Sequence, residues 1–397
     1  MHVTTATETS QPLTMASMVH ESSGDLANLD FLRAVAVSLV LFGHLLGTLR
    51  IRGLGDLGHL GVLLFFVHTA LVLMLSMGRL KTRGRGELYR RFTIRRGFRI
   101  YPLSILCVVV VTALRIPSTS WSTSYTWPGW EALASNILLV QNVSQTASVN
   151  CVLWSLPFEI QMYALLPALF LWLVNGWSWR RGMALSAMAV LIASSEYLMR
   201  PHGFDGEFLI TRYFPCFVSG VIAWKVMDRR NAAKWPGWIW VVGLLAIVLL
   251  YRGVDALRVY GPGAFNPFAP HGLRQDHGIW WPEFLDLPRD WLFCAGVGAL
   301  IPMFREVRQK WLKSTSKLIA KYSYGIYLFH VPVFYLFLSK WKTSIVALDL
   351  AITVGVLAIV VALAYRLIED PFIRMGKRLA SQPVARAALR AEEARVG

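Results

Sequence analysis

Charged residues are scarce in this chain, and their scarcity excludes an ordinary soluble protein. They make up 16% of its 397 residues, whereas soluble globular proteins carry about 25%. Hydrophobic residues make up 55% and the mean hydropathy is +0.48. The apolar residues gather in stretches of about 20, which is the length that crosses a bilayer. The composition therefore predicts an all-α, polytopic bundle of transmembrane helices.

Cysteine is also scarce, and several common signatures are missing. The four cysteines contain no CxxC pair and lie in or beside apolar stretches, so we expect small buried hydrophobes, no disulfide framework and no metal site. The chain has no GxSxG elbow, Walker A loop, HExxH or GxGxxG fingerprint. The cysteines are Cys107, Cys151, Cys216 and Cys294.

Acidic residues are too few to balance the basic ones. The 40 Lys and Arg against 23 Asp and Glu give a net charge of +17. These basic residues lie mainly in short segments between apolar runs, as the positive-inside rule requires of cytoplasmic loops. The charge therefore indicates a lipid bilayer as partner, and we expect no binding of nucleic acid.

Ten apolar stretches are long enough to cross a membrane. They cover 30–50, 57–77, 98–115, 151–174, 182–199, 208–225, 236–252, 289–304, 318–339 and 345–367. A shorter piece, 131–141, is too short to span unaided. If it stays on one side, the basic segments at 79–99, 180–181, 225–234, 305–317 and after 366 all face the cytoplasm, and both termini lie inside.

This topology predicts three regions. Residues 1–28 form a flexible polar tail without the features of a signal peptide or a basic targeting sequence. Residues 29–379 form the membrane domain, and 380–397 form a cytoplasmic tail. Two long outside segments, 116–130 and 253–288, mix aromatics with hydroxyls or charges, which suits either a sugar ring or an aromatic belt at the membrane interface.

The first span carries three titratable side chains, Asp30, Arg33 and His44. Such groups are costly inside a membrane, so each is a candidate functional residue. Asp30 and Arg33 share a helix face and can pair. His44 lies eleven residues beyond Arg33, about 16 Å along the axis and nearly on the same face. It suits either a general base or a structural histidine bonded to a neighbouring helix.

Arginines cluster where the third span begins. Arg95 and Arg96 adjoin, and Arg99 follows one turn later. Their guanidinium groups can converge on phosphate oxygens such as those of an acyl-CoA. The same cluster also suits positive-inside signalling and contact with lipid headgroups.

Later spans add further titratable residues. Glu159 lies in an apolar segment and needs a partner there, and Pro157 should disturb its helix locally. His59 and His68, in the second span, are interpreted as packing residues. The segment around Glu369 and Pro371 has an acid–Pro–basic order that is typical of a helix stop with an ion-paired end.

Taken in order, these segments resemble the acyltransferase-3 family of membrane O-acyltransferases over residues 29–379. The matching elements are Leu29-Asp30-x-x-Arg33-Ala34 followed by His44, Gly61-Val62-x-Leu64-Phe65-Phe66-Val67, Arg96-x-x-Arg99-Ile100-x-Pro102, Trp154-Ser155-Leu156-x-x-Glu159 with Tyr163 and Pro167, Arg212-Tyr213-Phe214 running to Gly220, Tyr322-Ser323-Tyr324-x-x-Tyr327-Leu328-x-His330, and Glu369-x-Pro371-Phe372.

The resemblance implies a ten-span protein of a bacterial cytoplasmic membrane. It would move an acyl group, commonly acetyl, from acyl-CoA to a sugar hydroxyl of a cell-surface or secreted glycan or glycoside, with no bound cofactor. Arg33 and His44 would be catalytic, Glu159 essential, and Arg96 and Arg99 would serve the donor.

In the resulting mechanism, Arg95 joins Arg96 and Arg99 at the donor phosphates, and His44 acts as base or transient acyl carrier. Glu159 or Asp30 would orient the imidazole. The residues expected to support them are Tyr163, Arg212, Tyr327 and His330.

The sequence departs from the family at His68-Thr69-Ala70, where many members have Ser-Gly, which is compatible with a different acceptor. The form expected here stands alone, without the fused esterase-like domain of some members. A proton-coupled transporter or flippase is the competing hypothesis, because titratable groups in spans suit it as well.

Overall fold

The computed structural model describes residues 26–51, 57–80, 84–122, 124–174, 176–199, 210–229, 235–260 and 286–381. Throughout these ranges the regular structure is helical and no β-strand forms, so the all-α prediction is confirmed for the described chain. Most of the predicted tails, and most of the outside segment 253–288, lie outside the described residues.

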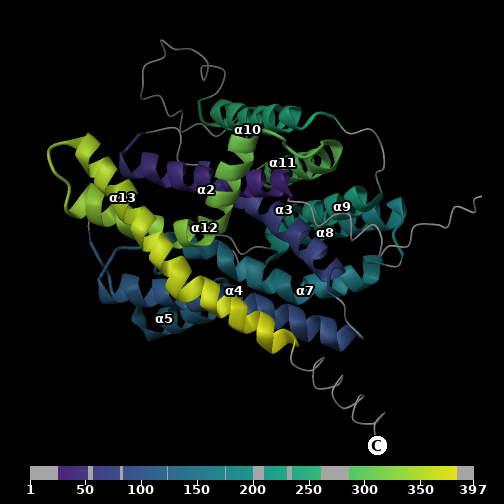
Figure 1. The fold of residues 1–397 in the computed structure, drawn as a ribbon, viewed down its shortest axis with the longest axis horizontal. Coiled ribbons are helices and arrows are strands. Elements are labelled where there is room, and N and C mark those ends of the chain that lie inside the picture. The colour runs from purple at the N-terminus through teal and green to yellow at the C-terminus, as the bar shows by residue number, and fades with distance from the viewer. Residues whose placement is uncertain are drawn as a thin grey trace, which may run out of the picture.

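Twelve α-helices are described within these ranges, and Figure 1 labels most of them. They are α2 (Ala27–Thr48), α3 (Leu57–Gly78), α4 (Arg85–Ala113), α5 (Gly129–Leu138), α6 (Gln141–Ser144), α7 (Leu156–Val174), α8 (Trp179–Met199), α9 (Phe214–Arg229), α10 (Gly237–Tyr260), α11 (Asp286–Leu300), α12 (Lys310–Phe334) and α13 (Val346–Ala364). The 3-10 turns are η1 (Cys151–Ser155), η2 (Ile210–Tyr213) and η5 (Ile301–Met303), and the π-helical turns are η6 (Tyr335–Lys340) and η7 (Tyr365–Glu369).

Six helical segments in the described chain are long and apolar enough to cross a membrane. They are Ala27–Thr48, Leu57–Gly78, Arg85–Ala113, Cys151–Val174, Gly237–Val254 and Val346–Ser381. The other four predicted spans coincide with α8, α9, α11 and α12. The count of ten spans and the inside termini stay predictions. The short piece at 131–141 falls on α5, whose 10 residues extend about 15 Å and are too short to cross.

The arginine-rich segment before the third span differs from its prediction. It is not a loop, because α4 begins at Arg85 and continues without a break into the apolar part of the span. Arginine is a good helix former, so a charged sequence can extend a membrane helix into water. The cluster at Arg95, Arg96 and Arg99 therefore has fixed positions on a helix.

The predicted helix stop at Glu369 and Pro371 is wrong. The helix that starts at Val346 continues to Ser381. A π-helical turn, η7, ends two residues before the proline, and such a wide turn accommodates the hydrogen bond that proline cannot donate. The predicted ion pair is present, since Arg374 Nη2 lies 3.0 Å from Asp370 Oδ2 one turn earlier.

Helices α2 and α3 pack against each other at the centre of the bundle, with α12 against α2 and α9 against α3 (Figure 1). The backbones of α2 and α3 approach closely because glycine lies at the crossing. A Cβ added to Gly43 would overlap the backbone at Gly58, and one added to Gly61 would lie 2.5 Å from the Ala36 carbonyl oxygen. Small residues allow such an approach between membrane helices. The crossing therefore fixes the position of His44, which follows Gly43 on α2.

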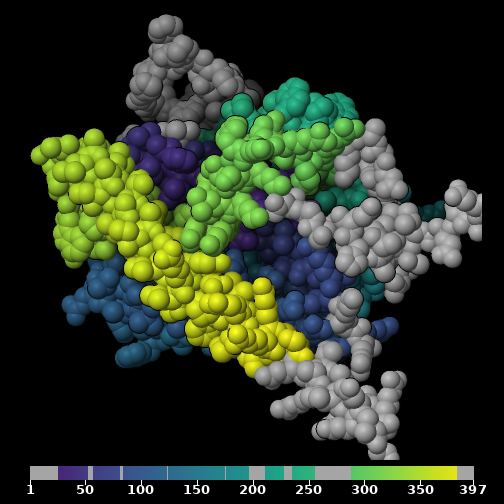
Figure 2. All heavy atoms as spheres, viewed as in Figure 1, coloured from purple at the N-terminus to yellow at the C-terminus, as the bar shows by residue number. Residues whose placement is uncertain are grey.

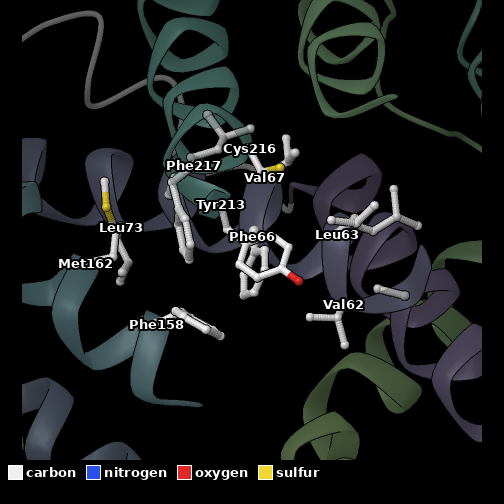
Figure 3. Close-up of a cluster of buried hydrophobic side chains, with 14 of the residues drawn as sticks. Val62, Leu63, Phe66, Val67, Leu73, Phe158, Met162, Tyr213, Cys216 and Phe217 are labelled. Atoms are coloured by element: carbon white, nitrogen blue, oxygen red, sulfur yellow. The ribbon is translucent and has the colours of Figure 1, made fainter. Parts of the chain in front are cut away.

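An aromatic cluster joins α3 to α7 and α9. The ring of Phe66 lies 4.6 Å from that of Phe217 and 6.5 Å from that of Phe158, and Tyr213 packs beside them. Figure 3 shows side chains from these helices meeting in the cluster. Each of these residues is at most 2% exposed. The cluster holds α7, which carries Glu159, at a fixed position against α3.

The outer surface of the bundle is apolar along several helices. On α13, which crosses the front of the molecule in Figure 2, Val354 and Ile359 are more than 60% exposed, as is Leu367 on the following turn η7. On α10, Leu249 is 60% and Leu250 67% exposed. A soluble protein does not present such rows of bare aliphatic side chains, so these faces suit the hydrocarbon core of a bilayer.

The glycine crossing gives a stability prediction. Gly61→Ala should destabilise the bundle by about 1–3 kcal/mol, the usual cost of overpacking, because its Cβ meets a carbonyl that cannot move independently of α2. Thermal unfolding of the purified protein in detergent measures the effect. Gly355→Ala on α13 is the matched control, since no described atom outside its own stretch of helix lies within 4 Å of its added Cβ. Equal melting temperatures for the two variants would contradict the proposed packing.

Candidate active site

A small, partly open cavity of about 80 Å³ lies between α2, α3, α4, α7 and α12. A water needs about 10–15 Å³ of such volume, so the cavity holds a few waters or a small acyl group. Its lining is unusually rich in charged and polar side chains for the interior of a membrane bundle. These are Arg33, His68, Thr69, Arg96, Arg99, Ser155, Glu159, Tyr163, Ser323, Tyr324 and Tyr327.

Arg33 reaches this cavity from α2 and is held by α12. Its Nε donates a 2.6 Å hydrogen bond to Ser323 Oγ, and Ser323 Oγ donates in turn to the Ala320 carbonyl at 2.8 Å. This bond fixes the guanidinium across a helix interface. Asp30 lies one turn earlier on α2 and is not part of the described lining.

Glu159 enters the same cavity from α7. Its Oε2 accepts a 2.9 Å hydrogen bond from the hydroxyl of Tyr163, one turn later, and both side chains line the cavity. Pro157 lies in the first turn of α7, directly after the 3-10 turn η1. The predicted local disturbance is therefore a change of helix type just before Glu159.

Two of the three predicted donor arginines contribute to the cavity. Arg96 and Arg99 line it, one turn apart on α4, whereas Arg95 does not appear in the lining. Arg99 Nη1 forms an ion pair with Glu369 Oε1, and the Glu369 side chain is 1% exposed. The π-helical turn η7 carries this carboxylate on the last helix toward α4.

His44 belongs to a second cluster, outside the described lining of the cavity. Its Nδ1 donates to the Val40 carbonyl at 2.9 Å, and its Nε2 lies 3.8 Å from Cys151 Sγ. Its ring lies 4.9 Å from the ring of His330 and stacks on Trp121 at 6.1 Å. A backbone carbonyl thus orients this imidazole, where the sequence had suggested Glu159 or Asp30.

Tyr327 on α12 lies between the cavity and the His44 cluster. It lines the cavity, and its ring lies 6.5 Å from that of His330. Its hydroxyl donates to the Val152 carbonyl at 2.7 Å and lies 2.7 Å from Ser155 Oγ. These bonds tie α12 to η1 and hold the Tyr327 ring in place.

A third group of polar side chains lies at the start of α3 and α11. His59 Nε2 forms a 2.9 Å ion-pair contact with Asp290 Oδ2, and the Tyr251 hydroxyl donates to Asp290 Oδ1 at 2.8 Å. Arg212 belongs to this region, because its carbonyl accepts the indole N–H of Trp291 at 2.9 Å. His59 is therefore more than the packing residue that the sequence predicted.

The structure thus divides the predicted site residues into groups. The cavity brings together Arg33, Arg96, Arg99, Glu159, Tyr163 and Tyr327, while His44 and His330 form the second cluster and Arg212 lies with the third.

Sequence reasoning missed Glu369, Cys151 and the cavity position of His68 and Thr69. The carboxylate at the end of an apolar run could have signalled Glu369. No local pattern distinguishes Cys151 from the other cysteines.

These features define a helical membrane protein with a buried, charged cavity. The model of the family described as Acyltransferase domain matches residues 26–367. The chain therefore belongs to the acyltransferase-3 family and is a membrane acyltransferase. No curated protein and no solved structure matches the chain.

Proposed function

We propose that this protein transfers an acyl group, acetyl in the simplest case, from acyl-CoA to a hydroxyl of a sugar. The acceptor is a cell-surface or secreted glycan or glycoside, and the enzyme acts in the bacterial cytoplasmic membrane with both termini inside. The observation that carries the proposal is the cavity in which Arg33, Arg96 and Arg99 meet Glu159 in a chain of this family.

The direction of α4 supports a donor that binds from the cytoplasmic side. This helix carries its arginines at the basic end and its apolar residues at the other, and basic ends of membrane helices face the cytoplasm. Arg96 and Arg99 therefore suit the phosphates of a cytoplasmic acyl-CoA, with Arg95 on the same stretch of helix. Both arginines line the cavity, so a donor held there by its phosphates would direct its thioester end into the bundle.

Exposed aromatic residues at the opposite end of the bundle support an acceptor that approaches from that side. Trp121 is 46% exposed and stacks on His44, and Trp127 and Trp130 are 50% and 79% exposed in the segment that follows. Flat aromatic faces beside hydrogen-bonding groups suit a sugar ring. An acceptor hydroxyl that approaches over Trp121 reaches the neighbourhood of His44, which can take its proton.

Acyl analysis of surface glycans and secreted glycosides tests the proposal in the source organism. A deletion strain should lose an O-acyl group that the wild-type gene restores and the Arg33→Ala gene does not. If the O-acyl groups of every fraction are unchanged by the deletion while export of a glycan or solute is altered, the proton-coupled transporter replaces this proposal.

A further inference from the structure

Cys151 differs from the other three cysteines in its surroundings. Cys107, Cys216 and Cys294 are fully buried at 0% exposure, whereas Cys151 is partly exposed. Its Sγ lies 3.8 Å from His44 Nε2, within the range of a hydrogen bond to sulfur. A thiol beside an imidazole is a nucleophile beside a base.

The hydrogen bonds of His44 determine which nitrogen can act as that base. Nδ1 must carry the proton, because the Val40 carbonyl at 2.9 Å can only accept. Nε2 therefore presents a lone pair to the Cys151 thiol. The base is oriented by a third group, the Val40 carbonyl, as in other nucleophile–base pairs.

A second observation is an unpartnered buried nitrogen beside this cluster. His330 is 0% exposed, its Nδ1 donates to the Ile326 carbonyl at 2.9 Å, and its Nε2 has no hydrogen-bond partner among the described residues. Buried polar atoms are rarely left in this state. Its ring lies against that of His44 at 4.9 Å, so a polar group that enters beside His44 and Cys151 would have a further donor or acceptor within reach.

Cys151 also lies close to the donor cavity. His44 lies outside the described lining of that cavity, so the acyl group has to pass from the cavity to the His44 cluster. Cys151 and Ser155 begin and end the 3-10 turn η1, about 8 Å apart along its axis at 2.0 Å per residue. Ser155 lines the cavity, so this one turn leads from the donor cavity to the His44 cluster.

We propose that Cys151 carries the acyl group as a thioester between acyl-CoA and the acceptor, with His44 as its base. This inference rests on the proposed function and adds a covalent intermediate to it. It requires that Tyr327, which separates the two groups of residues, moves to admit the thioester end of the donor.

Both half-reactions balance. In the first, the Cys151 proton passes to His44 Nε2, Sγ bonds to the acyl carbon, and the bond from that carbon to the CoA sulfur breaks. The CoA thiolate leaves with the proton from Nε2. In the second, the acceptor hydroxyl gives its proton to Nε2, its oxygen bonds to the acyl carbon, the bond to Sγ breaks, and Nε2 returns the proton to the thiolate.

The intermediate is testable without an acceptor. The purified full-length protein in detergent is incubated with acetyl-CoA labelled in the acetyl group, denatured in acid, digested and analysed by mass spectrometry. We expect one labelled peptide, carrying a hydroxylamine-sensitive acetyl group on Cys151. The same protein should exchange labelled free CoA into acetyl-CoA, because the first half-reaction is reversible.

Two cysteine variants test whether Cys151 acts as the nucleophile or only as a structural thiol. Cys151→Ala should lose the label and the CoA exchange and lower transfer by roughly 10²-fold or more. Cys107→Ala removes a neighbouring buried thiol, whose Sγ lies 3.4 Å from the Leu328 carbonyl oxygen, and should keep the label, the exchange and transfer. Melting temperatures of both variants show whether either has unfolded.

The outcomes distinguish this inference from the proposed function. Acyl transfer by the wild type without any label, or by Cys151→Ala at the rate of Cys107→Ala, would overturn the covalent intermediate and leave the proposed function standing. A label on His44 would also overturn it. Absence of both transfer and label across candidate acceptors would reject the proposed function and this inference with it.

Discussion

Replacement of His44 by alanine is expected to lower acyl transfer by about 10²–10⁴-fold, the usual contribution of a general base. The imidazole is held mainly by its own helix through the Val40 carbonyl, and its described hydrogen bond outside α2 is the long one of 3.8 Å to Cys151 Sγ, so its loss should cost little stability. The protein should therefore insert and melt as the wild type does. The measurement is the initial rate of transfer from acetyl-CoA to the acceptor identified by glycan analysis, with protein amounts matched.

A neighbouring variant controls for disturbance of α2. Phe42→Ala changes a side chain on the same helix that is 53% exposed on its outer face, and it should leave the rate unchanged. If His44→Ala keeps the full rate, His44 is structural, and both the base and the thiol partner proposed for it are excluded. If Phe42→Ala lowers the transfer rate as much as His44→Ala does, the loss is caused by disturbance of α2 and not by removal of the base.

The sequence predicted the arrangement along each helix better than the arrangement between helices. It placed His44 about 16 Å beyond Arg33 on one face of one span, which follows from the rise of the helix. It did not predict that Tyr327 would lie between the cavity and the His44 cluster, because that depends on how α12 packs against α2. Hydrophobic periodicity carries no information on such pairing.

Two residues illustrate the same limit. From the sequence, Glu369 was explained locally, as a charged helix end beside a proline. Its burial depends instead on the π-helical turn that directs it to Arg99 on α4. Cys151 follows the polar residue Asn150, but no sequence pattern gave its thiol a partner, and it is distinguished by its contact with His44 on α2. In both cases the deciding partner lies on a helix far away in the chain.

The buried ion pair of Arg99 and Glu369 gives the second large expected effect. Arg99→Gln alone should destabilise the protein by up to about 3–5 kcal/mol, because it leaves the Glu369 carboxylate, 1% exposed, without its partner. Glu369→Gln alone should cost less, because the Arg99 side chain is 22% exposed. The double variant should recover most of this loss. Unfolding of the four proteins in detergent measures the cycle, and Arg374→Gln is the control, since its pair with Asp370 is exposed on the arginine side at 62% and should contribute about 0–1 kcal/mol.

Donor affinity separates a structural arginine from one that binds phosphate. If Arg99 serves the donor, the Kd of a thioether analogue of acetyl-CoA should rise about 10- to 100-fold in Arg99→Gln, as expected for the loss of a charge-assisted hydrogen bond of about 1.5–3 kcal/mol. It should stay raised in the double variant although stability has returned. Recovery of wild-type Kd in the double variant would instead make the pair purely structural and leave the donor to Arg96 and Arg95. Stability and donor affinity diverge only in the double variant. That variant restores the charge balance of the bundle, and hence stability, but it does not restore a guanidinium group to the cavity.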